Sequence, residues 1–180
     1  MSGVKSFTEL LIWQRARALS KEIFRHTRNQ PFCTDKRLVV QINDSSESVM
    51  ANIAEGFGRG TQGEFILFLG YALGSLDETR SHLAAAYDRQ YLSRDDYAAL
   101  FAEGTEIRKM TVAFITSMVM PGSGVKHARK VPDWSEQVWE IYERVTGKPR
   151  PELFQKAAEE KREREEEAQR VRRRRKRRGE

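Results

Sequence analysis

The sequence predicts an all-α protein: an antiparallel up-down four-helix bundle, followed by a short helix and a charged helical or disordered tail. Three observations lead to this prediction. Apolar residues recur at helical spacing through the first 120 residues, no segment keeps the alternation of a strand, and helix-capping signals separate the patterns at short intervals. Long helices joined by short connections pack antiparallel to their neighbours.

The first helical pattern opens at the segment SFTE, where Ser6 and Glu9 have the spacing of a capping box, and it ends before Pro31. Its expected apolar stripe consists of Trp13, Ala16, Leu19, Ile23 and Phe24.

A second helix is expected from Thr34 or Asp35 to the glycines that follow Glu55. It places Leu38, Ile42, Val49 and Ile53 on one face, and Ser45 and Ser46 interrupt that face.

The third and fourth helices carry clear N-terminal signals. Thr61 is the expected N-cap of the third helix, with Glu64 three residues later. Ser93 is the expected N-cap of the fourth, and Asp95 and Asp96 then lie in the first turn, where the helix dipole favours acids. The glycines and proline of residues 121–124 end the fourth helix.

The sequence divides into four parts. Residues 1–120 form the bundle, 121–132 a linker, 133–147 a short amphipathic helix and 148–180 a charged tail. Asp133 and Glu136 give the short helix its N-cap signal, and Gly147 ends it. We expect this helix to dock on the bundle or on a neighbouring subunit.

The net charge of +6 belongs entirely to the C-terminal third. Residues 1–120 contain 14 Lys and Arg against 14 Asp and Glu, whereas residues 121–180 contain 18 against 12. Eight cations crowd into nine positions near the end, a pattern typical of polyanion binding. They are Arg170, Arg172, Arg173, Arg174, Arg175, Lys176, Arg177 and Arg178. A solubilising terminus or a localisation signal would have the same composition.

The segment NIAEGFGRG, residues 52–60, raises the question of a phosphate-binding loop. A dinucleotide fingerprint requires a strand before its glycines, but here a helix precedes them, and the chain has no Gly-Lys-Ser/Thr motif. We therefore predict that Gly56 and Gly58 supply the positive φ angles of a helix C-cap.

Other kinds of site lack the required residues. Glu22 with His26 and Glu78 with His82 are spaced four apart, whereas di-iron bundles use a spacing of three, so surface pairs are expected and no metal site. No nucleophile, paired carboxylates or cofactor motif form a catalytic constellation, so we expect neither a cofactor nor an enzyme.

The cellular setting follows from what the sequence contains. The single Cys33 cannot form an intramolecular disulfide and suits a reducing compartment. The N-terminus has no export signal, and no apolar stretch reaches the 18 residues of a membrane span. We expect a cytoplasmic protein that does not cross a membrane.

Several segments resemble one known family. LIWQRARALSKEIFRHT, LVVQI and SVMANIAEGFGRGTQGEFILFLGYALGSLDET, within residues 7–92, are similar to the four-helix bundle family typified by the 23S rRNA intervening-sequence proteins. The residues that match its motifs are Asn52, Glu55, Gly56, Gly58, Arg59, Gly74, Ser75 and Glu78. The resemblance implies a bacterial, cytoplasmic, non-enzymatic homopentamer. It also implies kinship with the accessory variability determinant of diversity-generating retroelements, a pentamer that binds a reverse transcriptase and nucleic acid.

This chain departs from the family pattern in three places. Asn43 and Asp44 stand where the family typically has a basic pair, and Arg80 stands where members often have Glu, two positions after the one that matches Glu78. Residues 121–180 lie outside the usual family core. The lost basic pair weakens the transfer of nucleic-acid binding to the body, and the basic tail is a candidate substitute.

Two functions remain open from the sequence. The first is an oligomeric scaffold that binds RNA or DNA, chiefly through the tail. The second is an accessory subunit whose main partner is a protein, such as the reverse transcriptase of a diversity-generating retroelement. Exposed aromatic residues, expected at Phe57, Tyr71 and Trp139, favour an oligomer. For Asn52, Glu55 and Arg59 we expect a buried polar network or a subunit contact, with ligand binding as the alternative.

Overall fold

A computed structural model of the chain describes residues 4–119, 135–152, 154–156, 159, 162–163 and 165–170. These residues form helices and no strand, which confirms the all-α class. The four long helices are α1 (Leu11–Thr27), α2 (Lys36–Gly58), α3 (Gln62–Asp88) and α4 (Arg94–Val119). Shorter elements are the 3-10 turns η1 (Phe7–Glu9) and η2 (Phe32–Thr34) and the helix α5 (Glu136–Thr146).

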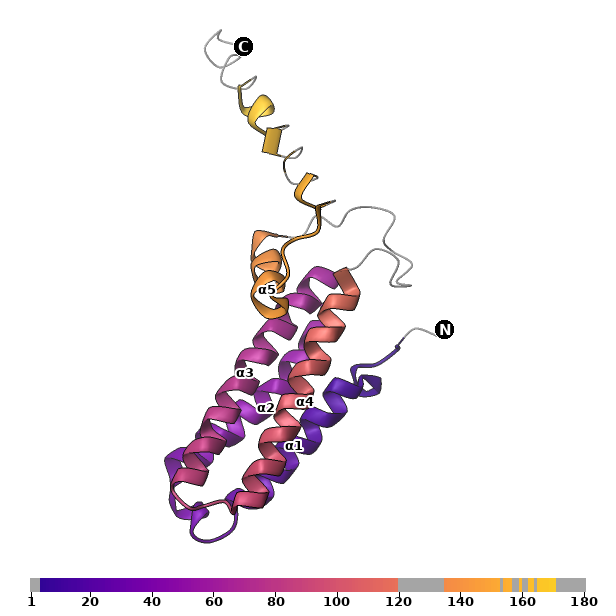
Figure 1. Cartoon of the computed structure of the whole chain (residues 1–180). Coiled ribbons are helices and arrows are strands. Elements are labelled where there is room, and N and C mark those ends of the chain that lie inside the picture. The colour runs from indigo at the N-terminus through magenta and orange to yellow at the C-terminus, as the bar shows by residue number, and fades with distance from the viewer. Residues whose placement is uncertain are drawn as a thin grey trace, which may run out of the picture.

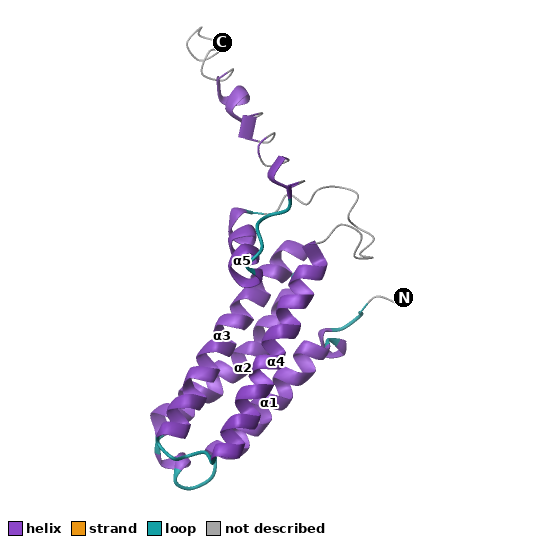
Figure 2. Ribbon diagram, in the orientation of Figure 1, coloured by secondary structure: helices purple, strands orange, loops and turns teal. Residues whose placement is uncertain are grey.

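The four long helices run alternately up and down and lie side by side (Figures 1 and 2). Each one contacts the next along the chain, and α1 also contacts α4, which closes the bundle. Apolar side chains from all four helices fill the centre. Those with no more than 1% of their surface exposed include Ile23, Ile42, Ile53, Ile66, Leu69, Leu76, Leu83, Ile107 and Ile115.

The start of the chain differs from the predicted capping box. Ser6 caps only the turn η1, through a bond from the Thr8 amide at 3.2 Å, and Leu10 is extended before α1 begins. Glu9 accepts from the Lys5 amide at 3.1 Å instead of from that of Ser6. The first helix is therefore shorter at this end than predicted.

Two aromatic residues assigned to the buried stripe of α1 lie elsewhere. Phe24 is 49% exposed, and Trp13 is only partly buried against Phe7. Ala16, Leu19 and Ile23 are buried as predicted. The predicted stripe was too wide, since α1 packs on α2 and α4 along a narrower line.

Ser45 and Ser46 interrupt the apolar face of α2 as predicted, since both are buried in it, and both hydroxyls are hydrogen-bonded. Each donates to a backbone carbonyl three residues earlier in its own helix. The Thr79 hydroxyl of α3 also donates to Ser45 Oγ at 3.1 Å, and Ser46 Oγ donates to Ser20 Oγ of α1 at 3.3 Å. These bonds satisfy polar groups that would otherwise be costly to bury.

The glycine corner between α2 and α3 is also different from the prediction. Gly56 and Gly58 are both helical, and α2 continues through them. Gly60 alone takes a positive φ, 77°, and makes the turn. Gly56 serves close packing: a Cβ there would lie 2.6 Å from Phe68 Cβ. Because Gly56 has no side chain, α3 can approach the backbone of α2 closely.

The predicted caps of the third and fourth helices are confirmed. Thr61 Oγ1 accepts from the Glu64 amide at 3.2 Å, and Ser93 Oγ accepts from the Asp96 amide at 3.1 Å. Asp35, one of two starts predicted for the second helix, caps α2 by accepting from the Leu38 amide at 3.1 Å.

The short helix α5 docks on the bundle, against α3 and α4 (Figure 1). Its N-cap is Ser135 instead of Asp133, which lies outside the described residues together with the linker at 121–132. Gly147 ends α5 with a φ of 67°, as predicted. Trp139, expected to be exposed, is 3% exposed, because it packs against Tyr142 of α5 and against Arg150 and Phe154 at the start of the tail.

Candidate nucleic-acid interface

The predicted basic site begins where the described part of the chain ends. Arg170 is helical and exposed, at the end of a helical stretch over 165–170. Arg172 to Arg178 lie outside the described residues. The described helical residues of the tail beyond Phe154 are exposed.

The tail leaves the bundle from a packed base. Phe154 is 7% exposed, and its ring centroid lies 4.8 Å from that of Trp139 on α5. The guanidinium of Arg150 lies over the Trp139 ring, 4.9 Å from its centroid, and pairs with Glu136. These contacts hold Arg150 and Phe154, at the start of the tail, against α5.

A close approach also fixes α5 on the bundle. A Cβ at Gly70 of α3 would lie 2.6 Å from Ile141 Cγ2. The absence of a side chain at Gly70 therefore leaves room for Ile141, which is 5% exposed. The residue at position 70 therefore determines how closely α5, which precedes the tail, can pack on α3.

The family-motif residues share the outer seam between α2 and α3. Asn52 donates to the Ser48 carbonyl at 2.9 Å and to Ser75 Oγ at 3.5 Å, and both side chains are partly buried. Gly74 is exposed, with open space beside it. Polar contacts thus join the two helices next to an open position.

Glu55 and Arg59 do not form the buried network that we expected. Their side chains are about half exposed and pair with each other at 2.5 Å. The hydrogen bond that Arg59 donates to Glu55 raises the pKa of the Arg59 guanidinium, which also lies 5.2 Å from the centroid of the Phe68 ring. Because both charged groups are exposed, a partner can contact them. The subunit contact at these residues stays a prediction.

The histidines have partly different neighbours from those predicted. His82 Nε2 lies 3.5 Å from the Glu78 carboxylate, so the predicted pair is present, but the His82 side chain is mostly buried, at 17% exposed, instead of lying at the surface. His26 is near Asp96 of α4, at 3.7 Å, while Glu22 pairs with Arg25. Within the described ranges, no three His, Cys, Asp or Glu residues are grouped so that they could hold a metal ion.

Arg80, the residue that departs from the family pattern, packs on α4. Its guanidinium lies 4.3 Å from the Phe101 ring centroid, and its Nη1 is 3.3 Å from Asp77. The same carboxylate is 3.4 Å from Arg108. Arg80 therefore contributes to packing between α3 and α4 more than to the charge of the surface.

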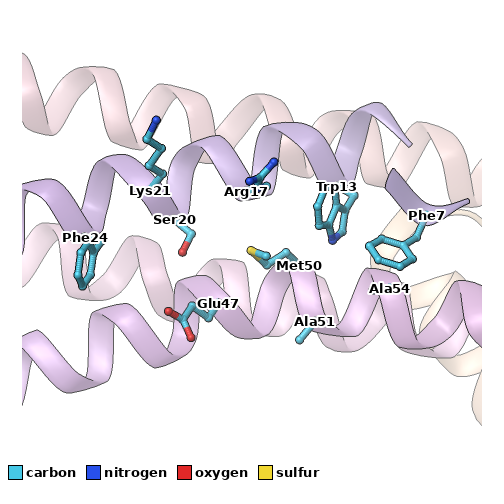
Figure 3. A pocket seen from close by; sticks show the side chains of 10 residues that line it. All are labelled: Phe7, Trp13, Arg17, Ser20, Lys21, Phe24, Glu47, Met50, Ala51 and Ala54. Atoms are coloured by element: carbon cyan, nitrogen blue, oxygen red, sulfur yellow. The ribbon is translucent and has the colours of Figure 1, made fainter. Parts of the chain in front are cut away.

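Sequence reasoning missed a groove of about 590 Å³ between α1 and α2 (Figure 3). It is lined by Phe7, Trp13, Arg17, Ser20, Lys21, Phe24, Glu47, Met50, Ala51 and Ala54. The apolar stripe predicted for the first helix places Trp13 and Phe24 in the core, so the sequence alone does not indicate a groove. The sequence does contain one signal for the groove, which is that basic residues lie between Trp13 and Phe24 at helical spacing.

Comparisons with known proteins agree on the fold. The family described as 23S rRNA-intervening sequence protein matches residues 8–113. A crystal structure of a protein of unknown function from the S23 ribosomal protein family of Bacteroides thetaiotaomicron is similar, with a TM-score of 0.54 and 24% identity. The match covers 58% of this chain and 98% of that one. No curated protein matches the chain.

Among the described helices, none is both long and apolar enough to cross a bilayer. The longest, α3, is interrupted on its surface by charged residues such as Asp77, Glu78 and Arg80.

Proposed function

This chain belongs to the family of 23S rRNA-intervening sequence proteins, and we propose that it is a non-enzymatic, oligomeric scaffold that binds nucleic acid. Phosphate contacts come chiefly from Arg170 and the basic residues 172–178. The observation that carries this proposal is the division of charge between a neutral body and a strongly basic tail. Lys and Arg contacts to phosphate release counterions and need no fixed geometry.

Ion pairs on the body support the assignment to the tail. Arg15 pairs with Glu103 at 2.6 Å, Arg89 with Asp35 at 2.5 Å and Lys109 with Glu106 at 2.7 Å. A cation held by a carboxylate offers less net charge to a polyanion. The exposed Arg170 and its neighbours have no such balance, since they include no acid between 170 and 178.

An oligomer would strengthen this binding. Several tails on one assembly raise the effective concentration of each after the first has bound. Exposed apolar side chains, such as Leu11, Val40 and Tyr71, support an oligomer, since surplus apolar surface marks interfaces. We assign a homopentamer in the cytoplasm from the resemblance to the family, and a mass measurement in solution tests the subunit number.

A second function is favoured by the exposed motif on α2 and α3. Glu55 and Arg59 are charged, exposed and matched to the family motif, and the motif residue Gly74 is also exposed, with open space beside it. Such a surface suits a protein partner, for which we propose a reverse transcriptase of a diversity-generating retroelement. A complex of this kind survives both high salt and loss of the tail.

The experiment that tests the first function removes residues 170–180 and measures binding of RNA and of DNA across a range of salt concentrations. We expect weaker binding and a flatter dependence of log affinity on log salt. Unchanged affinity and slope in the truncated protein would reject the assignment to the tail. A salt-resistant complex with a reverse transcriptase would favour the second function.

A further inference from the structure

The groove between α1 and α2 combines flat apolar walls with a cationic edge. Rings of Phe7, Trp13 and Phe24 and the thioether of Met50 line it, and Ala51 and Ala54 keep the α2 side shallow. Figure 3 shows Trp13 and Phe24 on α1 and Met50 rising from α2. At about 590 Å³ it has the size of a small-molecule site.

Cations accompany the aromatic rings along α1. Arg17 and Lys21 line the groove, and within the described part of the chain neither forms a salt bridge. The Arg17 guanidinium carbon lies 5.8 Å from the Trp13 ring centroid. Arg28 repeats this arrangement one step further, 5.7 Å from the Phe24 centroid.

The spacing of the aromatic residues on α1 suits an extended ligand with several repeating groups better than a single compact one. Phe24 lies eleven positions after Trp13, which corresponds to about 16 Å along a helix. Over that length, the guanidinium of Arg17 and the ammonium of Lys21 come from positions between the two aromatic residues. Nucleobases stack on aromatic rings and on guanidinium planes, and phosphates bind the cations between them.

We propose that this groove is a single-stranded nucleic-acid subsite, in which Trp13 and Phe24 stack on bases and Arg17, Lys21 and Arg28 contact phosphates. The identity of the ligand class rests on the proposed function, but the site lies on the bundle and is separate from the tail. Duplex bases are already stacked on one another, so single strands bind here in preference to duplexes.

One residue opposes an anionic ligand and provides a sharp test. Glu47 of α2 lines the same groove and forms no salt bridge within the described residues. Removing its charge in Glu47→Gln takes away repulsion from phosphate and strengthens binding. Asp44→Asn is the matched control, because Asp44 is exposed on the same helix and does not line the groove.

The main experiment measures binding of an oligo(U) 15-mer to the full chain by fluorescence anisotropy. Arg17→Glu with Lys21→Glu lowers the affinity at least tenfold, and Phe24→Ala lowers it about tenfold through lost stacking. The control pair Lys36→Glu with Arg37→Glu makes the same change in charge at exposed positions of α2 away from the groove, and has a smaller effect. Circular dichroism of each variant establishes that the helices are retained.

A second readout reports stacking directly. Oligo(U) quenches the fluorescence of Trp13, so the quenching decreases in Trp13→Phe, while the aromatic packing against Phe7 is kept.

Four results would overturn the subsite. The first is an equal affinity for oligo(U) of the groove pair, Arg17→Glu with Lys21→Glu, and of the control pair, Lys36→Glu with Arg37→Glu. The second is quenching that Trp13→Phe leaves unchanged. A fall in oligomer mass caused by the groove pair would instead identify the groove as an interface between copies. Loss of binding on removal of 170–180, with no effect of the groove pair, leaves the proposed function standing and rejects this inference. Reduced binding by the groove pair, with no effect of the tail truncation, supports the subsite and rejects the assignment to the tail.

Discussion

Gly56 of α2 lies directly against Phe68 of α3, so that a Cβ at position 56 would be 2.6 Å from Phe68 Cβ and 3.0 Å from the Phe65 ring. The close approach of α2 and α3 at this point depends on the absence of a side chain at Gly56. Gly58, two residues later in the same helix, has no atom within 4 Å of its virtual Cβ.

The substitutions Gly56→Ala and Gly58→Ala should have opposite effects on stability. The first forces α2 and α3 apart and costs about 1–3 kcal/mol. The second removes the entropic cost of glycine in a helix and gains up to about 1 kcal/mol. Urea unfolding at equal protein concentration measures both, and equal effects of the two substitutions would contradict the packing role of Gly56.

A second matched pair of glycines tests the docking of α5. Gly70→Ala places a methyl group 2.6 Å from Ile141 Cγ2, whereas Gly74→Ala on the same helix meets open space. We expect faster amide hydrogen exchange in α5 for the first variant only, because its docking is weakened. Adding Ile141→Ala should restore slow exchange in part, and failure of this rescue would argue against the contact.

Asp35 should contribute to stability in a pH-dependent way. The hydrogen bond that Asp35 accepts from the Leu38 backbone N–H lowers the pKa of Asp35 below its usual value near 3.9, and the interactions with Arg89 and Tyr91 lower it further. A lowered folded-state pKa means that this contribution is present above the unfolded-state pKa and is lost as the pH falls through the folded-state value.

Asp35→Asn keeps an N-cap side chain but removes the titrating charge. The variant should therefore lose less stability than the wild type when the pH is lowered from about 5 to 2. Asp44→Asn is the control, since Asp44 is exposed and forms no salt bridge within the described residues. Parallel acid-unfolding curves for Asp35→Asn and the wild type would contradict this role.

Sequence patterns predicted the bundle well because its core follows helical periodicity. Leu38, Ile42 and Ile53 are buried as their spacing indicated, and Thr61 and Ser93 cap their helices. Local hydrogen bonds and the helical repeat are properties of short segments, so they can be read from one sequence.

The errors share a different cause, which is that they depend on what lies across the bundle. Gly56 resembles a helix terminator, but its role is set by Phe68 of the next helix. Phe24 fits an apolar stripe and yet faces solvent, while Trp139 fits a surface position and is covered by Phe154. Tertiary contacts decided these positions, and no local pattern records them.

The candidate sites were predictable only in part. Composition alone identified the basic run that starts at Arg170, since charge needs no fold to be counted. The groove required the structure, because Trp13 of α1 and Met50 of α2 are distant in sequence and meet only in the bundle.

The most direct test of the central claim compares two variants of the full-length tail at constant chain length. In one, the arginines at 172–175, 177 and 178 become Lys, and in the other they become Gln. Binding of single-stranded RNA is measured as a function of salt. We predict that the Lys variant keeps the steep salt dependence, whereas the slope for the Gln variant falls by about 0.7 for each phosphate contact removed. Equal affinity and equal slope for the Gln variant and the wild type would contradict nucleic-acid binding through the tail.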